Sequence, residues 1–353
     1  MTTNEPKRVG VFGTGWGTRV SVPAFRAAGW EVAGLWSRKP ERAAMMGQRL
    51  EIPFATHEAA ALLERPEIDA VAIHTPPHMH LDLCRAAFAA GKHVLVDKPF
   101  ATNVDDARAL AAAAEDADLT AMVNYEFRYA PLRAQVEQLL KDGAIGAVRH
   151  ASIDLQTTNP LLQMDRPWRL DPAHGGGLLN ELGSHAIDRF RQWLGEIATV
   201  SAQFASFPPE GLDSSFTSED QISASFTFES GASATLSMSW VSDPPLGLRI
   251  VITGSDGVIL ATSPGSMLSE GEVKIGKAGD SQLTAIQAPA LDSDDLPADA
   301  VGTSARLIQA FATGIETGNS PAPNFTDGLH SQIAIDAMRE SASAGQVLPI
   351  ERE

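Results

Sequence analysis

Short apolar runs alternate with helical periodicity in the first third of the chain. Arg8–Phe12, Glu31–Trp36 and Ala70–Ile73 are three such runs, and segments with apolar residues every three or four positions separate them. Val94–Phe100 begins as a fourth run. Strands that alternate with helices predict an α/β fold with a doubly wound parallel sheet, whose last strand we place at Ala121–Asn124.

The apolar period changes to two in the second half of the chain, from about Arg149. Apolar residues alternate with polar ones before and after the turn at Ser230-Gly231, which predicts a hairpin with one buried face. Val200–Phe204, Leu248–Ile252 and Val258–Ala261 add strands to an antiparallel sheet. Helices that we expect to cover one face of this sheet lie at about Pro131–Leu140, Leu178–Leu194, Ser304–Thr317 and Asp327–Ala344.

The change of period predicts a domain boundary close to residue 124. Residues 1–124 are then the α/β domain and residues 125–353 an α+β domain. Because no Gly/Ser linker marks the boundary, we expect the two domains to pack together. The uncovered face of the antiparallel sheet is available to a second subunit, so a homodimer or homotetramer is expected.

Charge and composition narrow the class of partner. A formal net charge of −17 argues against general binding to nucleic acid or to an anionic membrane surface. The single cysteine, Cys84, cannot form an internal disulfide. No apolar signal region opens the chain and no span of about 20 apolar residues occurs. We therefore expect a cytoplasmic enzyme with a small-molecule partner.

A glycine-rich turn follows the first strand. It reads Gly13-Thr14-Gly15-Trp16-Gly17-Thr18 and leads into a helical pattern, as in turns that let a pyrophosphate approach bare backbone at a helix N-terminus. A tight turn without a ligand is the alternative. Gly13, Gly15, Trp16, Gly17 and Thr18 are therefore candidate cofactor-binding residues.

The end of the second strand bears on the choice of cofactor. An acid that would bind the free ribose 2′-hydroxyl is missing, and the chain reads Trp36-Ser37-Arg38-Lys39 instead. A serine hydroxyl and an arginine suit a 2′-phosphate. Ser37, Arg38 and Lys39 therefore favour NADP over NAD, unless the two cations are only solvated charges at a helix start.

Three histidines follow the strand Ala70–Ile73. The segment reads His74-Thr75-Pro76-Pro77-His78-Met79-His80. Its two prolines, and the absence of an adjacent carboxylate or cysteine, argue against a metal site. We expect Thr75, Pro76 and Pro77 to form a turn along the cofactor, with His80 at the start of the next helix, and we count all four as candidate cofactor-binding residues.

The strand Val94–Val96 ends abruptly in Asp97-Lys98-Pro99. Ligands of open parallel sheets bind at the carboxyl edge of the strands, so Lys98 is expected close to the reactive end of the cofactor. The bond before Pro99 is a candidate for the cis form. Lys98 is a catalytic candidate and Asp97 a cofactor-binding candidate; the alternative is that Lys98 only caps the strand.

A second catalytic candidate lies in the other half of the chain. Gly175-Gly176-Gly177 opens a helix on which Glu181 and His185 are four residues apart and share one face, with Asp188 close to the same stripe. A carboxylate beside an imidazole holds its tautomer and prepares it to accept an alcohol proton. A histidine satisfied in the core, or an exposed pair, is the alternative.

Taken in order, the glycine turn, Asp97-Lys98-Pro99, Trp168-Arg169 and the glycine run leading to His185 resemble the Gfo/Idh/MocA family. The resemblance implies a Rossmann domain for NAD(P), and an α+β domain with an open, mainly antiparallel sheet for substrate binding and oligomerisation. It also implies redox chemistry on a carbohydrate or polyol, with Lys98 and His185 as the family's catalytic lysine and histidine. Asp97, Glu181 and Thr18 depart from the usual family residues.

The leading hypothesis is therefore an NADP-dependent dehydrogenase or reductase acting on a sugar or cyclic polyol, with Glu181 orienting His185. Two alternatives stay open: a sensor that binds NADP(H) without turnover, and a redox-neutral glycosidase that retains NAD. Candidates to line the sugar pocket, in addition to Lys98 and His185, are Tyr125, Arg128, Trp168 and Arg169.

Overall fold

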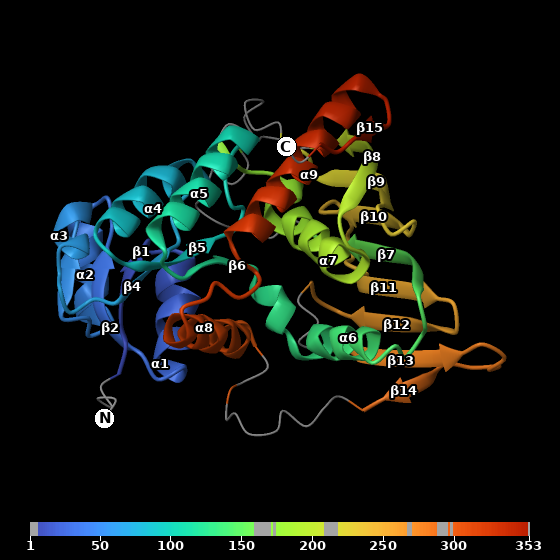
Figure 1. Cartoon of the computed structure of the whole chain (residues 1–353), viewed down its shortest axis with the longest axis horizontal. Coiled ribbons are helices and arrows are strands. Elements are labelled where there is room, and N and C mark those ends of the chain that lie inside the picture. Colours follow the sequence, from blue (N-terminus) through green and yellow to red (C-terminus); the bar gives the residue numbers. More distant parts are fainter. Residues whose placement is uncertain are drawn as a thin grey trace. The chain divides into compact units, whose positions relative to one another are not determined.

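Two separate sheets, each with its own hydrophobic core, organise the chain. The computed structural model describes residues 6–158, 171, 174–207, 218–266, 270–287, 296 and 299–351, and Figure 1 labels their helices and strands. The chain divides into two units: Met1–Glu126 with Asp295–Leu329, and Phe127–Asp294 with His330–Glu353. The first unit thus includes a segment from far beyond residue 124, where the sequence analysis placed a single boundary.

The first unit holds a six-stranded parallel sheet with the strand order β3-β2-β1-β4-β5-β6. The prediction of a doubly wound parallel sheet is confirmed, because the order reverses between β1 and β4 and every pairing is parallel. Its central strands are nearly continuous apolar runs, as expected for strands buried on both faces. The strands are β1 (Arg8–Phe12), β2 (Glu31–Trp36), β3 (Phe54–Thr56), β4 (Ala70–Ile73), β5 (His93–Asp97) and β6 (Ala121–Asn124).

Helices lie on both faces of this sheet (Figure 1). Three of these helices are neighbours, since α4 contacts both α3 and α5: α3 (Ala59–Leu63), α4 (His80–Ala89) and α5 (Val104–Ala117). Asn103 caps α5, since its side chain accepts a hydrogen bond from the Asp106 amide. The remaining helices are the turn η1 (Gly17–Ser21), which runs into α1 (Val22–Ala27), then α2 (Pro40–Arg49), the turn η2 (Pro77–Met79) and α8 (Ala300–Thr317).

Helix α8 packs in the first unit, against α1. The Phe311 ring of α8 stacks on the Trp30 ring with centroids 6.0 Å apart. After α8 the chain pairs with the edge strand β6, because the Val123 amide donates to the Pro323 carbonyl and the Ala121 amide to Ser320 Oγ. The expectation that Ser304–Thr317 covers the antiparallel sheet was wrong, since its apolar face meets Trp30.

The second unit holds a nine-stranded sheet with the order β14-β13-β12-β11-β7-β10-β9-β8-β15. Its pairings are antiparallel except β7 with β10, so the predicted mainly antiparallel sheet is confirmed. The predicted hairpin turns at Gly231 between β9 and β10. The strands are β7 (Val148–Gln156), β8 (Ile197–Ala205), β9 (Gln221–Phe228), β10 (Ser233–Ser239), β11 (Gly247–Gly254), β12 (Gly257–Ser263), β13 (Glu272–Lys277), β14 (Thr284–Ile286) and β15 (Leu348–Pro349).

One face of this sheet is covered by helices, and the core lies between the two layers (Figure 1). The other face carries the outward residues of each strand, which alternate strictly with buried ones along β9. None of the helices in the described residues is both long and apolar enough to cross a membrane. The covering elements are α6 (Pro131–Lys141), the turn η7 (Leu179–Gly183), α7 (Ser184–Leu194) and α9 (Phe325–Ala344), which begins in the first unit.

Candidate active site

The glycine turn lies at the carboxyl end of β1, where the backbone meets the next strand closely. Gly13 has φ of 109°, and a Cβ built on it would lie 2.3 Å from the carbonyl oxygen of His74. A Cβ on Gly17 would lie 3.0 Å from Val11 Cγ1. A side chain is therefore excluded at Gly13 and would be tightly packed at Gly17, so bare backbone follows the end of β1.

The other residues of the turn hold its shape. Thr18 is buried, and its hydroxyl donates to the Thr14 carbonyl at 3.0 Å. Trp16 is half-buried, with the Arg19 guanidinium 5.9 Å from its ring centre. The helical turn that follows is wide, with amide bonds to the fifth preceding residue, a geometry common at functional sites.

The end of β2 adds positive charge beside this turn. Ser37 is buried and its amide donates to the Thr56 carbonyl, whereas Arg38 and Lys39 are exposed. The sequence analysis missed Arg42, whose guanidinium donates to both the hydroxyl and the carbonyl oxygen of Thr14, at 2.6 Å and 3.1 Å. Its position one helical turn after Arg38 was the available signal.

The ends of β4, β5 and β6 meet at the carboxylate of Asp97. Asp97 Oδ2 lies 3.2 Å from His74 Nδ1, and Oδ1 accepts from the Lys98 amide at 3.0 Å and from Asn124 Nδ2 at 3.1 Å. Burial opposes ionisation, but the charge and hydrogen bond of His74, together with Lys98 and Asn124, lower the pKa of Asp97 to about 2. Asp97 is therefore an anion at neutral pH. Neither His74 nor Asn124 was singled out from the sequence for this role.

The side chain of His80 fixes the turn after β4. This side chain is fully buried, with Nδ1 3.1 Å from the Phe100 carbonyl oxygen and Nε2 3.0 Å from that of Thr75. Burial lowers its pKa. His80 thus links the Thr75-Pro76-Pro77 turn to the chain that follows Lys98, whose bond to Pro99 is cis.

His185 lies on α7 in the second unit, where its ring is 2% exposed. The imidazole stacks on the Phe127 ring with centroids 3.9 Å apart and 12° between the planes. Glu181 is buried one helical turn earlier, in η7, and its amide donates to the Gly177 carbonyl. Gly177 has φ of 105°, and a Cβ there would lie 2.5 Å from the Glu219 carboxylate, so the glycine is needed where η7 begins.

Buried ion pairs clamp the Phe127 segment onto α7. Asp188 Oδ1 and Oδ2 accept from Arg128 at 2.5 Å and 2.8 Å, and both side chains are almost fully buried. The fully buried Arg189 donates to the Phe127 carbonyl at 2.6 Å and lies 3.6 Å from Glu137. The desolvation of Arg189 lowers its pKa to about 10. Arg128, a candidate for the sugar pocket, is thus held in a fork by Asp188.

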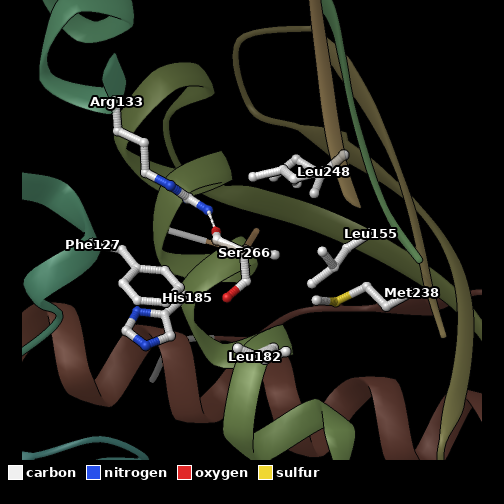
Figure 2. A pocket seen from close by; sticks show the side chains of 10 residues that line it. Phe127, Arg133, Leu155, Leu182, His185, Met238, Leu248 and Ser266 are labelled. Carbon is white, nitrogen blue, oxygen red and sulfur yellow. Dashed lines mark hydrogen bonds between the residues drawn. The ribbon is translucent and has the colours of Figure 1, made fainter. Parts of the chain in front are cut away.

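Figure 2 shows a small cavity beside His185, between α7 and the sheet. It holds about 10 Å³ for the centre of a water molecule, which is room for about one water and far too little for a sugar. Arg133 closes one side, donating to the Ser266 carbonyl at 2.8 Å (Figure 2). Its other lining residues are mainly apolar: Ile153, Leu155, Leu182, Met238 and Leu248.

The remaining candidates are placed as follows. Tyr125 is fully buried at the end of the first unit. Trp168 and Arg169 lie outside the described residues. The described part of the chain contains no group of three or more His, Cys, Asp or Glu side chains arranged to hold a metal ion.

Two family models match the chain. The model described as an oxidoreductase family with an NAD-binding Rossmann fold matches residues 7–125, and the model of the GFO/IDH/MocA C-terminal domain matches residues 134–260. The chain belongs to the GFO/IDH/MocA family. It is an oxidoreductase of that family with an NAD-binding Rossmann fold, and the family resemblance stated from the sequence is confirmed.

Relatives within the GFO/IDH/MocA family align over nearly the whole chain. D-xylose 1-dehydrogenase (NADP(+)) 2 of Haloferax volcanii is 28% identical and covers 97% of this chain and 99% of its own. Glucose-fructose oxidoreductase domain-containing protein 2 of Homo sapiens is 26% identical, with coverages of 96% and 92%. Levoglucosan dehydrogenase in complex with NADH and levoglucosan has the same fold, with a TM-score of 0.87 at 22% identity over 99% of this chain and 100% of that one.

The clamp on α7 gives a stability prediction. Asp188→Asn removes the charge that faces the buried Arg128, so it is expected to lower the free energy of unfolding by about 3–5 kcal/mol, measured by urea denaturation. Glu272→Gln is the control, because its ion pair with Lys274 is largely exposed and is worth less than about 1 kcal/mol. Equal losses for the two variants would contradict a clamp role for Asp188.

Proposed function

We propose that this protein transfers a hydride between NADP and a hydroxyl or keto carbon of a sugar or related cyclic polyol. The observation that carries the proposal is the shared edge of the parallel sheet, where the bare glycine turn and Lys98 both follow strand ends. Two relatives support the substrate class, since one is named a D-xylose dehydrogenase and another a levoglucosan dehydrogenase.

The first unit fits a dinucleotide. Gly13 excludes a side chain and Gly17 leaves little room for one, so a pyrophosphate could approach the backbone amides at the start of the η1–α1 helix. Gly13, Gly15, Trp16, Gly17 and Thr18 would form this part of the site, with Thr75, Pro76 and Pro77 along the neighbouring strand end. The nicotinamide supplies the chemistry of accepting or donating the hydride.

NADP is the proposed cofactor, with NAD as the alternative. Arg38 is exposed directly after β2, without an acid that would bind the ribose 2′-hydroxyl, and Ser37 precedes it. Arg42 holds Thr14 from the same side and adds a second cation close to the turn. The Haloferax relative is named as NADP-dependent, whereas levoglucosan dehydrogenase was solved with NADH, so the relatives do not decide between the two.

The proposed chemistry uses two residues, Lys98 and His185. Lys98 donates a hydrogen bond to the reacting oxygen and stabilises negative charge on it as its proton leaves. His185 accepts that proton in the oxidative direction, with its ring fixed by the stack on Phe127. Glu181, one turn earlier on the same helical face, orients the imidazole. Tyr125, Trp168 and Arg169 stay predictions as residues of the sugar pocket. Arg128 is bound by Asp188 and is better suited to fixing Phe127, whose ring stacks on His185.

Lys98→Ala and His185→Ala are each expected to lower kcat/KM at least about tenfold, because each removes an interaction with the reacting oxygen. The measurement is NADPH formation or consumption across a panel of sugars and cyclic polyols. Lys274→Ala is the matched control and is expected to stay within about twofold. Losses below tenfold in both test variants would contradict the assigned roles, and tight NADPH binding without turnover on any substrate would favour a sensor instead.

Arg38→Ala is expected to raise the dissociation constant of NADPH about tenfold or more and that of NADH less than about twofold. The physical reason is the loss of a charge-assisted bond to the 2′-phosphate, which NADH lacks. Fluorescence titration of both dinucleotides measures the effect, and Arg85→Ala, an exposed arginine on α4, is the control. An equal weakening of both dinucleotides would contradict NADP selection by Arg38.

A homodimer or homotetramer is also proposed. On the face of the second sheet that no helix of the described residues covers, β9 carries Ser, Thr and Gln side chains, a polar surface able to pair with its own copy. Light scattering at micromolar concentration is expected to give a multiple of the 37.5 kDa chain mass. A monomeric mass would contradict the proposal.

A further inference from the structure

The imidazole of His74 lies beneath the glycine turn in the first unit. His74 directly follows β4, and its side chain is 1% exposed. Its Cβ and Cδ2 would both lie 3.5 Å from a Cβ on Gly17, and its carbonyl faces Gly13. The ring therefore packs directly against the backbone that the dinucleotide would approach.

Both ring nitrogens of His74 have partners on different elements. Nε2 lies 2.8 Å from the Ser21 hydroxyl at the end of η1, and Nδ1 lies 3.2 Å from the Asp97 carboxylate at the end of β5. Asp97 in turn accepts the amide of Lys98. A continuous series of polar contacts thus links η1, through His74 and Asp97, to Lys98, the residue that carries the proposed catalytic ammonium.

The order Ser21, His74, Asp97 has the connectivity of a Ser-His-Asp hydrolase triad. Ser21 is only 2% exposed and is enclosed between η1 and the ring, so its hydroxyl does not reach a substrate. A nucleophilic role is therefore excluded by burial. Ser21, His74 and Asp97 therefore form a structural network that fixes the backbone of the elements to which they belong.

We propose that His74 is a positioning residue, which acts through Asp97 to fix the main chain that carries Lys98 and to tie that chain to the glycine turn. The inference rests on the proposed function, because it explains how Lys98 is kept in place for hydride transfer. It assigns a role to a histidine for which the sequence analysis argued against a metal site and offered no other function. The physical reason is that a displacement of the Lys98 ammonium by about an ångström is enough to lower the rate of the reaction by a large factor.

The charges around Asp97 make the role measurable. His74 faces the carboxylate from the end of β4, Lys98 follows it directly after β5, Asn124 faces it from β6, and the charge of Asp97 acts on His80 of α4. Burial alone would raise the pKa of Asp97, and His74 is the largest influence that lowers it. Removal of His74 is therefore expected to raise the pKa of Asp97 above its value of about 2.

The test compares His74→Ala with the wild type in kcat, KM and NADPH affinity between pH 5 and 9. We expect kcat to fall about tenfold at pH 7.5 while the NADPH dissociation constant changes less than about threefold. We also expect kcat of the variant to fall more steeply than that of the wild type toward acidic pH, because the pKa of Asp97 is raised and activity needs its ionised form. In His74→Asn the side-chain amide nitrogen is bonded to Cγ, as Nδ1 is in histidine, so an N–H donor is restored at that position. We expect this variant to recover most of the lost kcat and most of the change in the pH dependence of kcat.

His93→Ala is the matched control. His93 begins the same strand β5 at its opposite end and accepts the Thr120 amide through Nδ1. It is expected to lower the melting temperature without altering the pH profile of kcat. If His74→Ala behaved in the same way, or if His74→Asn recovered nothing, the positioning role would be overturned.

A second measurement does not depend on turnover. Carboxyl ¹³C NMR of aspartate-labelled protein follows the titration of Asp97, whose resonance is assigned with Asp97→Asn. His74→Ala is expected to raise its midpoint by at least one pH unit, and an unchanged midpoint would overturn the inference. Absence of turnover in the wild type would instead count against the proposed function alone.

Discussion

The register of parallel pairing at the centre of the first sheet is the constraint on which the site depends. Phe12 pairs with Ile73, Ile73 with Val96, and Asp97 with Asn124, so four neighbouring strands end at one level. A shift of one residue in any strand would turn its terminal side chain to the other face. The backbone register of these strands therefore brings together the glycine turn, His74, Asp97 and Lys98.

In the second unit the candidate catalytic residue, His185, is positioned in a different way. This histidine is on a helix rather than at a strand end, and the helix is fixed by burying charge. Asp188 and Arg189 of α7 hold Arg128 and the Phe127 carbonyl, and the Phe127 ring then supports His185. Buried ions are costly unless every partner is present. The ion pair, the hydrogen bond to the Phe127 carbonyl and the ring stack together fix the orientation of the His185 imidazole.

Local patterns predicted what depends on local physics. Apolar runs and the glycine turn predicted β1, β2, β4 and β5 as strands of a parallel sheet, and alternation predicted the hairpin of β9 and β10. Three-residue strands such as β3 were missed, because their half-buried residues carry no periodic signal. The position of α8 was wrong, since its apolar stripe fits either core and only the partner Trp30 decides. His74 was missed because its partners come from elements that are distant in the sequence, which neither its spacing nor its neighbours reveal.

The return of residues 295–329 to the first unit has a consequence for how the protein is made. During synthesis the first six strands leave the ribosome early, yet Trp30 and the edge of β6 lack their covering until α8 and the segment after it have emerged. Domains that are continuous in sequence complete themselves one after another as translation proceeds. Here strands β7 to β14 of the second sheet interrupt the nucleotide-binding part, so its core closes only when nearly all of the polypeptide has been translated.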